Sequence, residues 1–467
     1  MAILSALFNC GQTNHYSQVF PGTRDCTSAA MQKAIEDWFS LYYAGKSDEK
    51  EDPCQRLPVA VVSKLQKACF GEYAAQITAK GAKADYMIRC QQALDKQRKR
   101  AVQLAMIGGE AWLKPIPARD RMLWSVVRRD AVAILARNTG GEVTDMVTSA
   151  RTAAQGGVYT LLERRTMNAN GYLTIINKLF FSQDGNTLGR SVPLDSLDQY
   201  DQMQSEYTFQ QPVGSIGLVS LRMPMENTVD GSMDGVSVYA PAAELIHRIN
   251  HNEYQLNQEF ELGAFRIFAS SDLIKRKSGK SMLPDGLFVG IDDDPKNTGI
   301  TEFAPQLREE SFLARKNEYL RNVESVLGIK RGLLCETADV QRTATEVASS
   351  AGDYSLTVQD LWEVWEKADR EALRLCDVLG QMYRICPAGA FDPAKDVAIT
   401  WGNGVLYDPD QDLAEEMEMV AAGMLRPEYP LAKKYNLPRE TEEDLAQIRE
   451  KYMPKMEQLL GPDTGEE

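Results

Sequence analysis

The chain has 467 residues, 43% of them hydrophobic, which is enough to bury sizeable cores in two or three domains. Its 66 acidic and 52 basic side chains give a formal net charge of −14. This balance excludes a global basic surface that would attract nucleic acid by counterion release, so any contact with DNA must be local.

The first half of the chain predicts helices followed by strands. Apolar residues recur at helical spacing from 29 to 107, interrupted by the charged, proline-containing segment 46–58. After Gly108-Gly109 the pattern changes to a strand, Glu110–Pro115. Further strands are expected up to residue 240, including a hairpin of residues 158–162 and 172–176 whose turn, 168–171, ends in Asn-Gly.

The next segments predict two helices around an insert. Residues 241–268 begin with Pro241, suited to a first helical turn, and read as a long, partly exposed helix. Residues 270–301 carry glycines, prolines and a short apolar run, which predicts a small β-containing projection. Residues 306–327 return to an amphipathic helix, so a pair of helices brackets the insert.

The clearest periodicity lies between Leu361 and Met382, where apolar residues alternate steps of four and three and predict a core helix. After Trp401 the chain turns through Gly402-Asn-Gly404. An acidic, methionine-containing segment and further charged helix are expected up to about residue 455, and residues 461–467 are expected to be disordered. The predicted class is α+β, mainly helical.

The cysteines and the hydropathy give no sign of export. Neither a basic segment at the N-terminus nor a stretch approaching about 18 apolar residues is present, so no secretion and no membrane span are predicted. The cysteines lack Cys-x-x-Cys spacing and predict reduced thiols in a cytosolic product. They are Cys10, Cys26, Cys54, Cys69, Cys90, Cys335, Cys376 and Cys386.

Three arrangements of polar residues contain side chains that could ligate a metal. His247 and His251 lie four apart on a predicted helix and would need a carboxylate such as Glu244, but no Glu follows the first His as in the metalloprotease motif. The segment Asp408–Asp412 begins like a calcium loop but lacks the later glycine and glutamate, and 292–294 reads as a solvated turn. No metal and no cofactor are predicted.

Common catalytic motifs are missing from the chain. It has no Gly-x-x-x-x-Gly-Lys-Ser/Thr loop for phosphate, no Gly-x-Gly-x-x-Gly after a strand and no Gly-x-Ser-x-Gly turn. The absence of these motifs disfavours a motor ATPase or a common hydrolase, and no enzyme activity is predicted. A phage enzyme based on carboxylates, which leave little linear signature, stays as an alternative.

Four separated blocks resemble the portal proteins of long-tailed bacteriophages, and they occur in the same order. Gly108–Pro115 is similar to the Gly-Glu-aromatic strand of that family. Pro224–Asn227 and Gly235–Tyr239, followed by a polar helix, resemble the family's Asn…Gly-x-Ser approach to its first stem helix.

The third block is the strongest. Val323–Gly328 is followed by Gln341–Val347, whose Thr-Ala-Thr-Glu-Val run is close to a family signature and opens a long helix. In the fourth block, Val397–Trp401 with the later Asp408 and Ala422–Leu425 is similar to the family's closing strand and acidic C-terminal helix. A different phage structural protein, such as an adaptor or capsid subunit, is the alternative. It should lack the arrangement of long helix, insert and long helix followed by the Thr-Ala-Thr-Glu-Val segment.

The resemblance implies a portal-type fold with wing, long-helix stem, small α/β clip, tunnel loop and helical crown. Its parts would be the N-terminal wing (1–240), a stem helix (241–265), the clip (266–301), the second stem helix (302–327), the tunnel-loop region (328–341), the rest of the wing (342–400), and the crown with a disordered tail (401–467).

The resemblance also implies function and partners. The chain would form a homo-oligomeric ring, usually of twelve subunits, at one vertex of the capsid, assembled in the host cytoplasm and carried in the virion. Double-stranded DNA would pass through it without sequence specificity. The clip would bind the terminase large subunit and later the head-completion or adaptor protein, and the ring would contact the major capsid and scaffolding proteins.

Two groups of charged residues are the candidate functional residues. At the tunnel loop, Lys330 and Arg331, and next to them Arg342, are candidates for transient contact with phosphate. In the clip, two clusters of opposite charge are candidates for pairing between neighbouring subunits or for docking the motor. These are Lys275, Arg276 and Lys277, and Asp292, Asp293 and Asp294. Ordinary solvated charge remains the alternative for both groups.

Overall fold

The computed structural model confirms the α+β class, with about 48% helix and 21% strand. The chain divides into two compact units, Met1–Gly404 and Val405–Glu467. The structure describes residues 16–43, 54–154, 156–185, 187–262, 266–269, 276–277, 280–281, 287–289, 300–303, 307–335, 344–401, 416–435 and 442–453.

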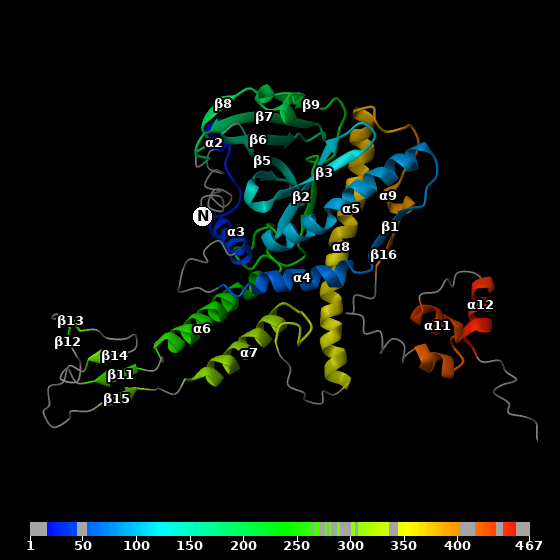
Figure 1. Ribbon diagram of the computed structural model, residues 1–467. Helices are drawn as coiled ribbons and strands as arrows, with labels where there is room; N and C mark the ends of the chain where they lie inside the picture. Colours follow the sequence, from blue (N-terminus) through cyan, green and yellow to red (C-terminus); the bar gives the residue numbers. More distant parts are fainter. Residues whose placement is uncertain are drawn as a thin grey trace, which may run out of the picture. The chain divides into compact units, whose positions relative to one another are not determined.

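Helices dominate the beginning of the first unit, as predicted (Figure 1). A short helix, α2 (Tyr16–Val19), precedes α3 (Ala29–Tyr43), α4 (Leu57–Phe70) and α5 (Ala82–Gly108). Each of the three longer helices buries an apolar face in the main core. Helix α5 is followed by Gly109, whose φ of +80° is the left-handed conformation that glycine adopts most readily.

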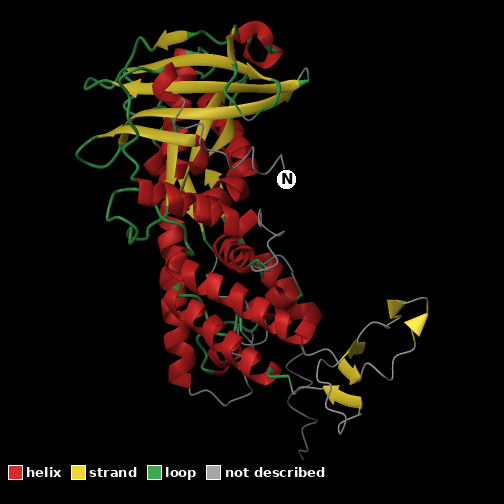
Figure 2. Cartoon of the chain, turned by 90° about the vertical axis from the view of Figure 1, so that its left-hand side faces the viewer, coloured by secondary structure: helices red, strands yellow, loops and turns green. Residues whose placement is uncertain are grey.

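Two antiparallel sheets follow. The first has the order β10-β2-β3, and the second has the order β4-β5-β6-β7-β8 with β9 paired to β7. In Figures 1 and 2 the strands of the second sheet lie side by side at one end of the first unit. The strands are β2 (Glu110–Pro117), β3 (Met122–Arg128), β4 (Val132–Arg137), β5 (Val143–Ala154), β6 (Gly157–Met167), β7 (Leu173–Ser182), β8 (Arg190–Val192), β9 (Glu206–Thr208) and β10 (Val219–Arg222).

Two strand predictions are confirmed. The predicted strand after Gly109 is β2, the central strand of its sheet. The predicted hairpin is formed by β6 and β7, with Met167 opposite Leu173 at its closed end. The Gly171 amide donates to the carbonyl of Asn168, and Gly171 has a φ of +79°. The Asn-Gly pair therefore forms the turn as predicted.

The 39-residue helix α8 (Ala344–Met382) carries the predicted apolar stripe. Its residues between Leu361 and Leu379 on that side are buried in the main core, and the Trp365 side chain is fully buried. The same side also carries a carboxyl group, Asp369, whose Oδ1 accepts a 2.7 Å hydrogen bond from Nε2 of Gln91 on α5. Both residues are buried, so the contact between α5 and α8 contains a polar pair inside an apolar core.

The end of the first unit is a strand pair that joins distant parts of the chain. The predicted closing strand is β16 (Val397–Thr400), which pairs with β1 (Ala74–Ile77), a strand that the sequence did not predict. Trp401, the next residue, stacks on Trp362 of α8 at 5.2 Å between ring centroids. Trp401 therefore packs with the first unit, and the second unit begins at Val405. The assignment of residues 401–467 to a crown stays a prediction.

The two helices that bracket the insert are present. They are α6 (Ala243–Leu262) and α7 (Glu309–Val326). Between them, β11 (Arg266–Ala269) pairs with β14 (Leu287–Val289) and β15 (Ile300–Phe303), and β12 (Arg276–Lys277) pairs with β13 (Lys280–Ser281). The helix predicted for 306–327 begins at Glu309. Residues 302 and 303, which the resemblance assigned to a second stem helix, belong to the strand β15.

The second unit is small and helical in its described part. Helices α11 (Glu428–Lys434) and α12 (Glu442–Tyr452) bury Ala432, Leu445 and Ile448 against each other. The predicted disordered tail and the acidic segment from Asp408 to Asp412 lie outside the described residues.

Candidate functional site

The tunnel-loop candidates lie in a tight turn directly after α7. The Leu333 amide donates to the carbonyl of Lys330 at 3.3 Å, which closes a four-residue turn. Gly332, in the third position, has a φ of +89°, the geometry of a type II turn. Arg331 occupies the second position and is exposed, whereas Lys330 is half-buried. Arg342 lies outside the described residues.

The turn is held by the carboxylate of Glu324, a fully buried residue near the end of α7. The Gly332 amide lies 3.1 Å from each carboxylate oxygen, and the amides of Leu334 and Cys335 donate to Oε1 at 2.6 and 3.2 Å. The Cys335 thiol donates to Oε2 at 3.1 Å. Sequence analysis did not identify Glu324 as functional.

Other helices also fix the residues that lead into the turn. The Thr357 hydroxyl of α8 donates to the carbonyl of Gly328 at 3.2 Å, and the Lys64 ammonium of α4 donates to the carbonyl of Leu333. Leu327 and Ile329 are buried in the main core. The turn is therefore attached to three helices, and Arg331 is displayed from a fixed base.

Helices α6 and α7 run antiparallel, with polar contacts along their length. The Asn252 side chain donates to the carbonyl of Phe312 at 3.2 Å. Glu253 pairs with Lys316 at 2.8 Å, and Glu259 pairs with Arg308 at 2.9 Å. Hydrogen bonds from Arg308 lower the pKa of the half-buried Glu259 carboxyl. Ion pairs that are partly accessible to solvent contribute little stability, so we expect these two pairs to fix the register of α6 and α7 more than to stabilise their contact.

The two histidines of α6 do not meet. Nε2 of His247 lies 3.1 Å from Oδ1 of Asp37 on α3, while the ring of His251 lies 5.9 Å from that of Tyr254. Within the described residues, no group of three or more His, Cys, Asp or Glu side chains has the arrangement of a metal site. The seven cysteines of these segments are free thiols.

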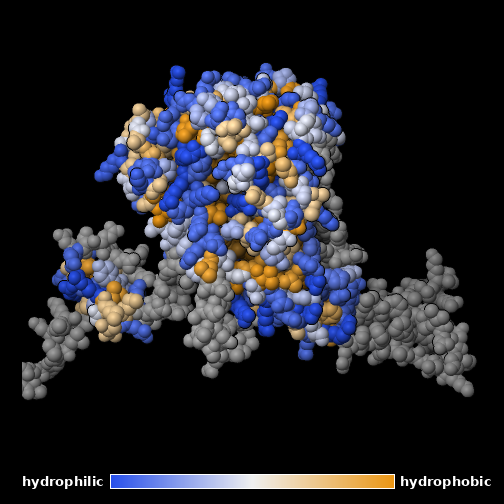
Figure 3. All heavy atoms as spheres, turned by 180° about the vertical axis from the view of Figure 1, so that it is seen from behind, coloured by the Kyte–Doolittle hydropathy of each residue, from blue (hydrophilic) through white to orange (hydrophobic). Residues whose placement is uncertain are grey.

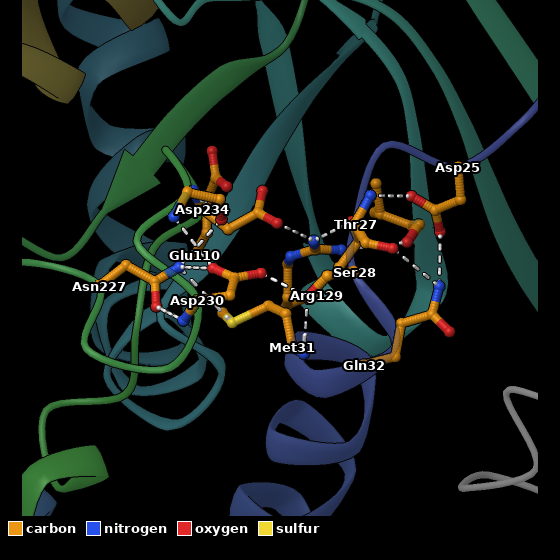
Figure 4. Close-up of polar contacts among 12 residues, drawn as sticks. Asp25, Thr27, Ser28, Met31, Gln32, Glu110, Arg129, Asn227, Asp230 and Asp234 are labelled. Atoms are coloured by element: carbon orange, nitrogen blue, oxygen red, sulfur yellow. Dashed lines mark hydrogen bonds and ion pairs between the residues drawn. The ribbon is translucent and has the colours of Figure 1, made fainter.

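The segment before α6 is anchored by the buried ion network of Figure 4. Nη2 of Arg129 donates to the Thr27 hydroxyl at 2.8 Å and lies 3.6 Å from the Asp234 carboxylate. Asp234 also pairs with Arg137 at 2.7 Å, and Arg137 lies 3.5 Å from the Glu110 carboxylate. Because Arg129, Asp234 and Glu110 are buried, each needs its partners to offset the cost of desolvation.

The same place brings together two blocks that the sequence analysis singled out, Gly108–Pro115 and Gly235–Tyr239. A Cβ added at Gly109 would lie 2.2 Å from the Gly235 carbonyl oxygen, so the two backbones touch. The Val238 amide and the Ser237 hydroxyl both donate to the carbonyl of Met106, at 3.0 and 2.9 Å. The end of α5 therefore fixes the start of the segment that leads into α6.

The clip candidates are only partly described. Arg276 and Lys277 form β12, and Lys277 pairs in register with Lys280 of β13. Lys275 and the acidic cluster 292–294 lie outside the described residues. The predicted pairing of the two clusters thus stays a prediction.

Comparisons with known proteins give no family for this chain. No protein-family model matches it, and no curated protein sequence matches it. Among the described helices, none combines the length and the apolar character that crossing a bilayer requires.

Proposed function

We propose that this chain is the portal protein of a tailed bacteriophage, one subunit of a ring through which DNA is packaged and ejected. The observation that carries the proposal is the order of the elements. Two antiparallel helices, α6 and α7, bracket a small β insert, and a tight turn and the long helix α8 follow. Portal proteins, as the sequence resemblance implies, use this order for stem, clip, tunnel loop and wing.

The charge of the chain supports a conduit for DNA. Phosphate contacts release counterions and would hold DNA in place, whereas a net charge of −14 favours sliding. The face shown in Figure 3 is mostly hydrophilic, with apolar residues in separate patches. A single exposed guanidinium on a fixed turn, that of Arg331, suits transient contact with a passing phosphate.

The proposal includes partners and location. The ring, usually of twelve copies, would sit at one capsid vertex in the virion and contact the scaffolding and major capsid proteins during assembly. The insert between α6 and α7 would dock the terminase large subunit and later the head-completion protein. No cofactor is proposed, and chemical energy would come from the separate motor because this chain has no phosphate-binding loop.

The rival hypothesis, a carboxylate-based enzyme, needs an accessible carboxyl group with a shifted pKa. Burial raises the pKa of Asp369 to about 7, but the residue is fully buried between α5 and α8. The groove beside β7 and the hollow beside Arg24 are not lined by Asp369. A second rival, an adaptor subunit, also forms rings and is separated from a portal by whether the motor binds.

The first test is electron microscopy of the purified protein together with its mass at several concentrations. We expect closed rings of roughly a dozen subunits, with a central channel at least as wide as the roughly 20 Å duplex. A monomer at every concentration, even with scaffolding and capsid proteins added, would contradict the proposal. Rings that fail to bind a terminase motor would favour the adaptor reading.

A charge-reversal experiment tests the pairing of the two clip clusters. Changing Lys275, Arg276 and Lys277 to glutamate should raise the concentration needed for ring assembly by about tenfold, because the three proposed pairs would be lost and repulsion would replace them. Adding the reverse change, lysine at 292–294, should restore assembly. The acidic-cluster reversal alone is the matched control and should weaken assembly equally. If the variant with both clusters reversed assembles as poorly as the variants with one cluster reversed, the clusters do not pair.

A further inference from the structure

The Glu324 carboxylate is held almost entirely by donors from one short loop. Within the described residues, its partners are the amides of Gly332, Leu334 and Cys335 and the thiol of Cys335, at 2.6 to 3.2 Å. These residues follow Glu324 by eight to eleven positions. The carboxylate and its loop are thus a local unit built within one stretch of chain.

This arrangement makes the loop and the carboxylate depend on each other. A fully buried carboxylate without hydrogen bonds is costly, and charged acceptors form stronger hydrogen bonds than neutral ones. All the donors come from residues whose amides converge only when the chain turns at Lys330–Leu333. Releasing the loop would therefore leave the carboxylate without its partners.

The conformation of the turn places Arg331 at an exposed position. Gly332 supplies the φ of +89° that the third position requires, and its amide is the one that contacts both carboxylate oxygens. Arg331, in the second position, is exposed while Leu327, Ile329 and Cys335 on either side are buried. Arg331 is thus the exposed charged residue of the Lys330–Leu333 turn.

We propose that Glu324 is a positioning residue: its carboxylate holds the Lys330–Leu333 turn in the conformation that presents Arg331 to the phosphate backbone of DNA. The part that concerns DNA rests on the proposed portal function. The part that concerns the turn does not, so the two are tested separately.

The first experiment measures amide hydrogen exchange in the full-length protein by mass spectrometry. In Glu324→Gln, an amide group replaces one acceptor oxygen and turns N–H groups towards the N–H groups of the loop. We expect exchange in a peptide covering 328–335 to become at least about tenfold faster, with unchanged exchange in a peptide of α8 covering 361–382. The matched control, Glu318→Gln, alters an exposed glutamate on the same helix and should change neither peptide.

A second variant keeps the experiment decisive if Glu324→Gln folds poorly. Gly332→Ala leaves the carboxylate in place but strains the turn, because alanine disfavours a φ of +89°. It should give the same local increase in exchange. Unchanged exchange at 328–335 in both variants, or an equal increase in both peptides, would overturn the positioning role.

The second experiment uses assembled rings and measures how salt affects their retention of duplex DNA. Arg331→Ala should reduce the dependence of retention on salt because a phosphate contact is lost. Glu324→Gln should reduce it by a similar factor, and the double variant should show no further reduction, since both changes act on one contact. Additive effects, or no effect of Arg331→Ala, would overturn the role in DNA contact. Failure to form rings would overturn the portal function while leaving the exchange result intact.

Discussion

Replacing Gly109 with alanine is expected to destabilise the first unit severely. The new Cβ would lie 2.2 Å from the Gly235 carbonyl oxygen and 2.5 Å from the Val236 amide nitrogen, and backbone atoms cannot move aside as a side chain can. Alanine must also adopt the φ of +80° found at this position. Strain and overpacking together should cost about 2–6 kcal/mol of unfolding free energy.

A matched control separates these two causes. Gly231 has a similar φ of +67°, but a Cβ there meets no atom within 4 Å. Gly231→Ala should therefore cost only about 1–2 kcal/mol, the strain of a left-handed alanine. Denaturant unfolding at one protein concentration, followed by tryptophan fluorescence, measures both, since all six tryptophans lie before residue 405. Equal losses in the two variants would contradict the close approach of the Gly109 and Gly235 backbones.

The elements that the sequence predicted well are those whose signal is local. The alternating steps of four and three from Leu361 to Met382 identify one side of α8, and the Asn-Gly pair before Tyr172 identifies the turn between β6 and β7. The strand after Gly109 was found in the same way, from a change of period and two glycines. In each case one continuous stretch of the chain contains the whole pattern.

Contacts between distant segments could not be predicted in this way. Strand β1 has only four residues, and it exists because residues 397–400 pair with it across more than 300 positions. Likewise Gly109 and Gly235 look like separate turn residues until the fold brings their backbones together. The resemblance assigned residues 302 and 303 to a helix, whereas pairing with β11 makes them part of a strand.

The sequence positions of two buried carboxylates, Glu324 and Asp369, indicate that the fold buries them. Glu324 lies four positions after Leu320 and three before Leu327, inside the apolar stripe of α7. Asp369 lies four after Trp365 and three before Ala372 in α8, and Gln91 lies between Met87 and Leu94 in α5. Position within the apolar stripe of a helix thus distinguishes Glu324 and Asp369 from most of the 66 acidic residues as side chains that the fold buries.

Ionisation of Asp369 is expected to make the stability of the protein depend strongly on pH. Burial raises its pKa to about 7, and nearby Asp95 contributes while the Gln91 hydrogen bond and the cations of Arg98 and Arg370 oppose the shift. In the unfolded chain the carboxyl should ionise near its ordinary pKa of about 4. Between these values the folded state binds more protons, so stability falls as pH rises towards 7 and levels off above it.

Protonation also explains two buried atoms that have no partner among the described residues, Oδ2 of Asp369 and Oε1 of Gln91. Gln91 already donates through Nε2 to Oδ1. We expect a proton on Oδ2 to be donated to Oε1, which would make the pair between α5 and α8 reciprocal. Above the pKa this second bond is lost, and a charge is left in the apolar core.

Asp369→Asn should therefore stabilise the protein at alkaline pH. The asparagine amide can donate to Oε1 of Gln91 at any pH, so it imitates the protonated acid. Relative to the variant, the unmodified protein should lose about 3 kcal/mol of unfolding free energy between about pH 5 and about pH 8. Asp360→Asn, an exposed position on the same helix, controls for net charge and should show no such difference. Parallel stability curves for Asp369→Asn and the unmodified protein across this range would mean that Asp369 titrates normally, and the buried pair would then have to be held by the ionised carboxylate.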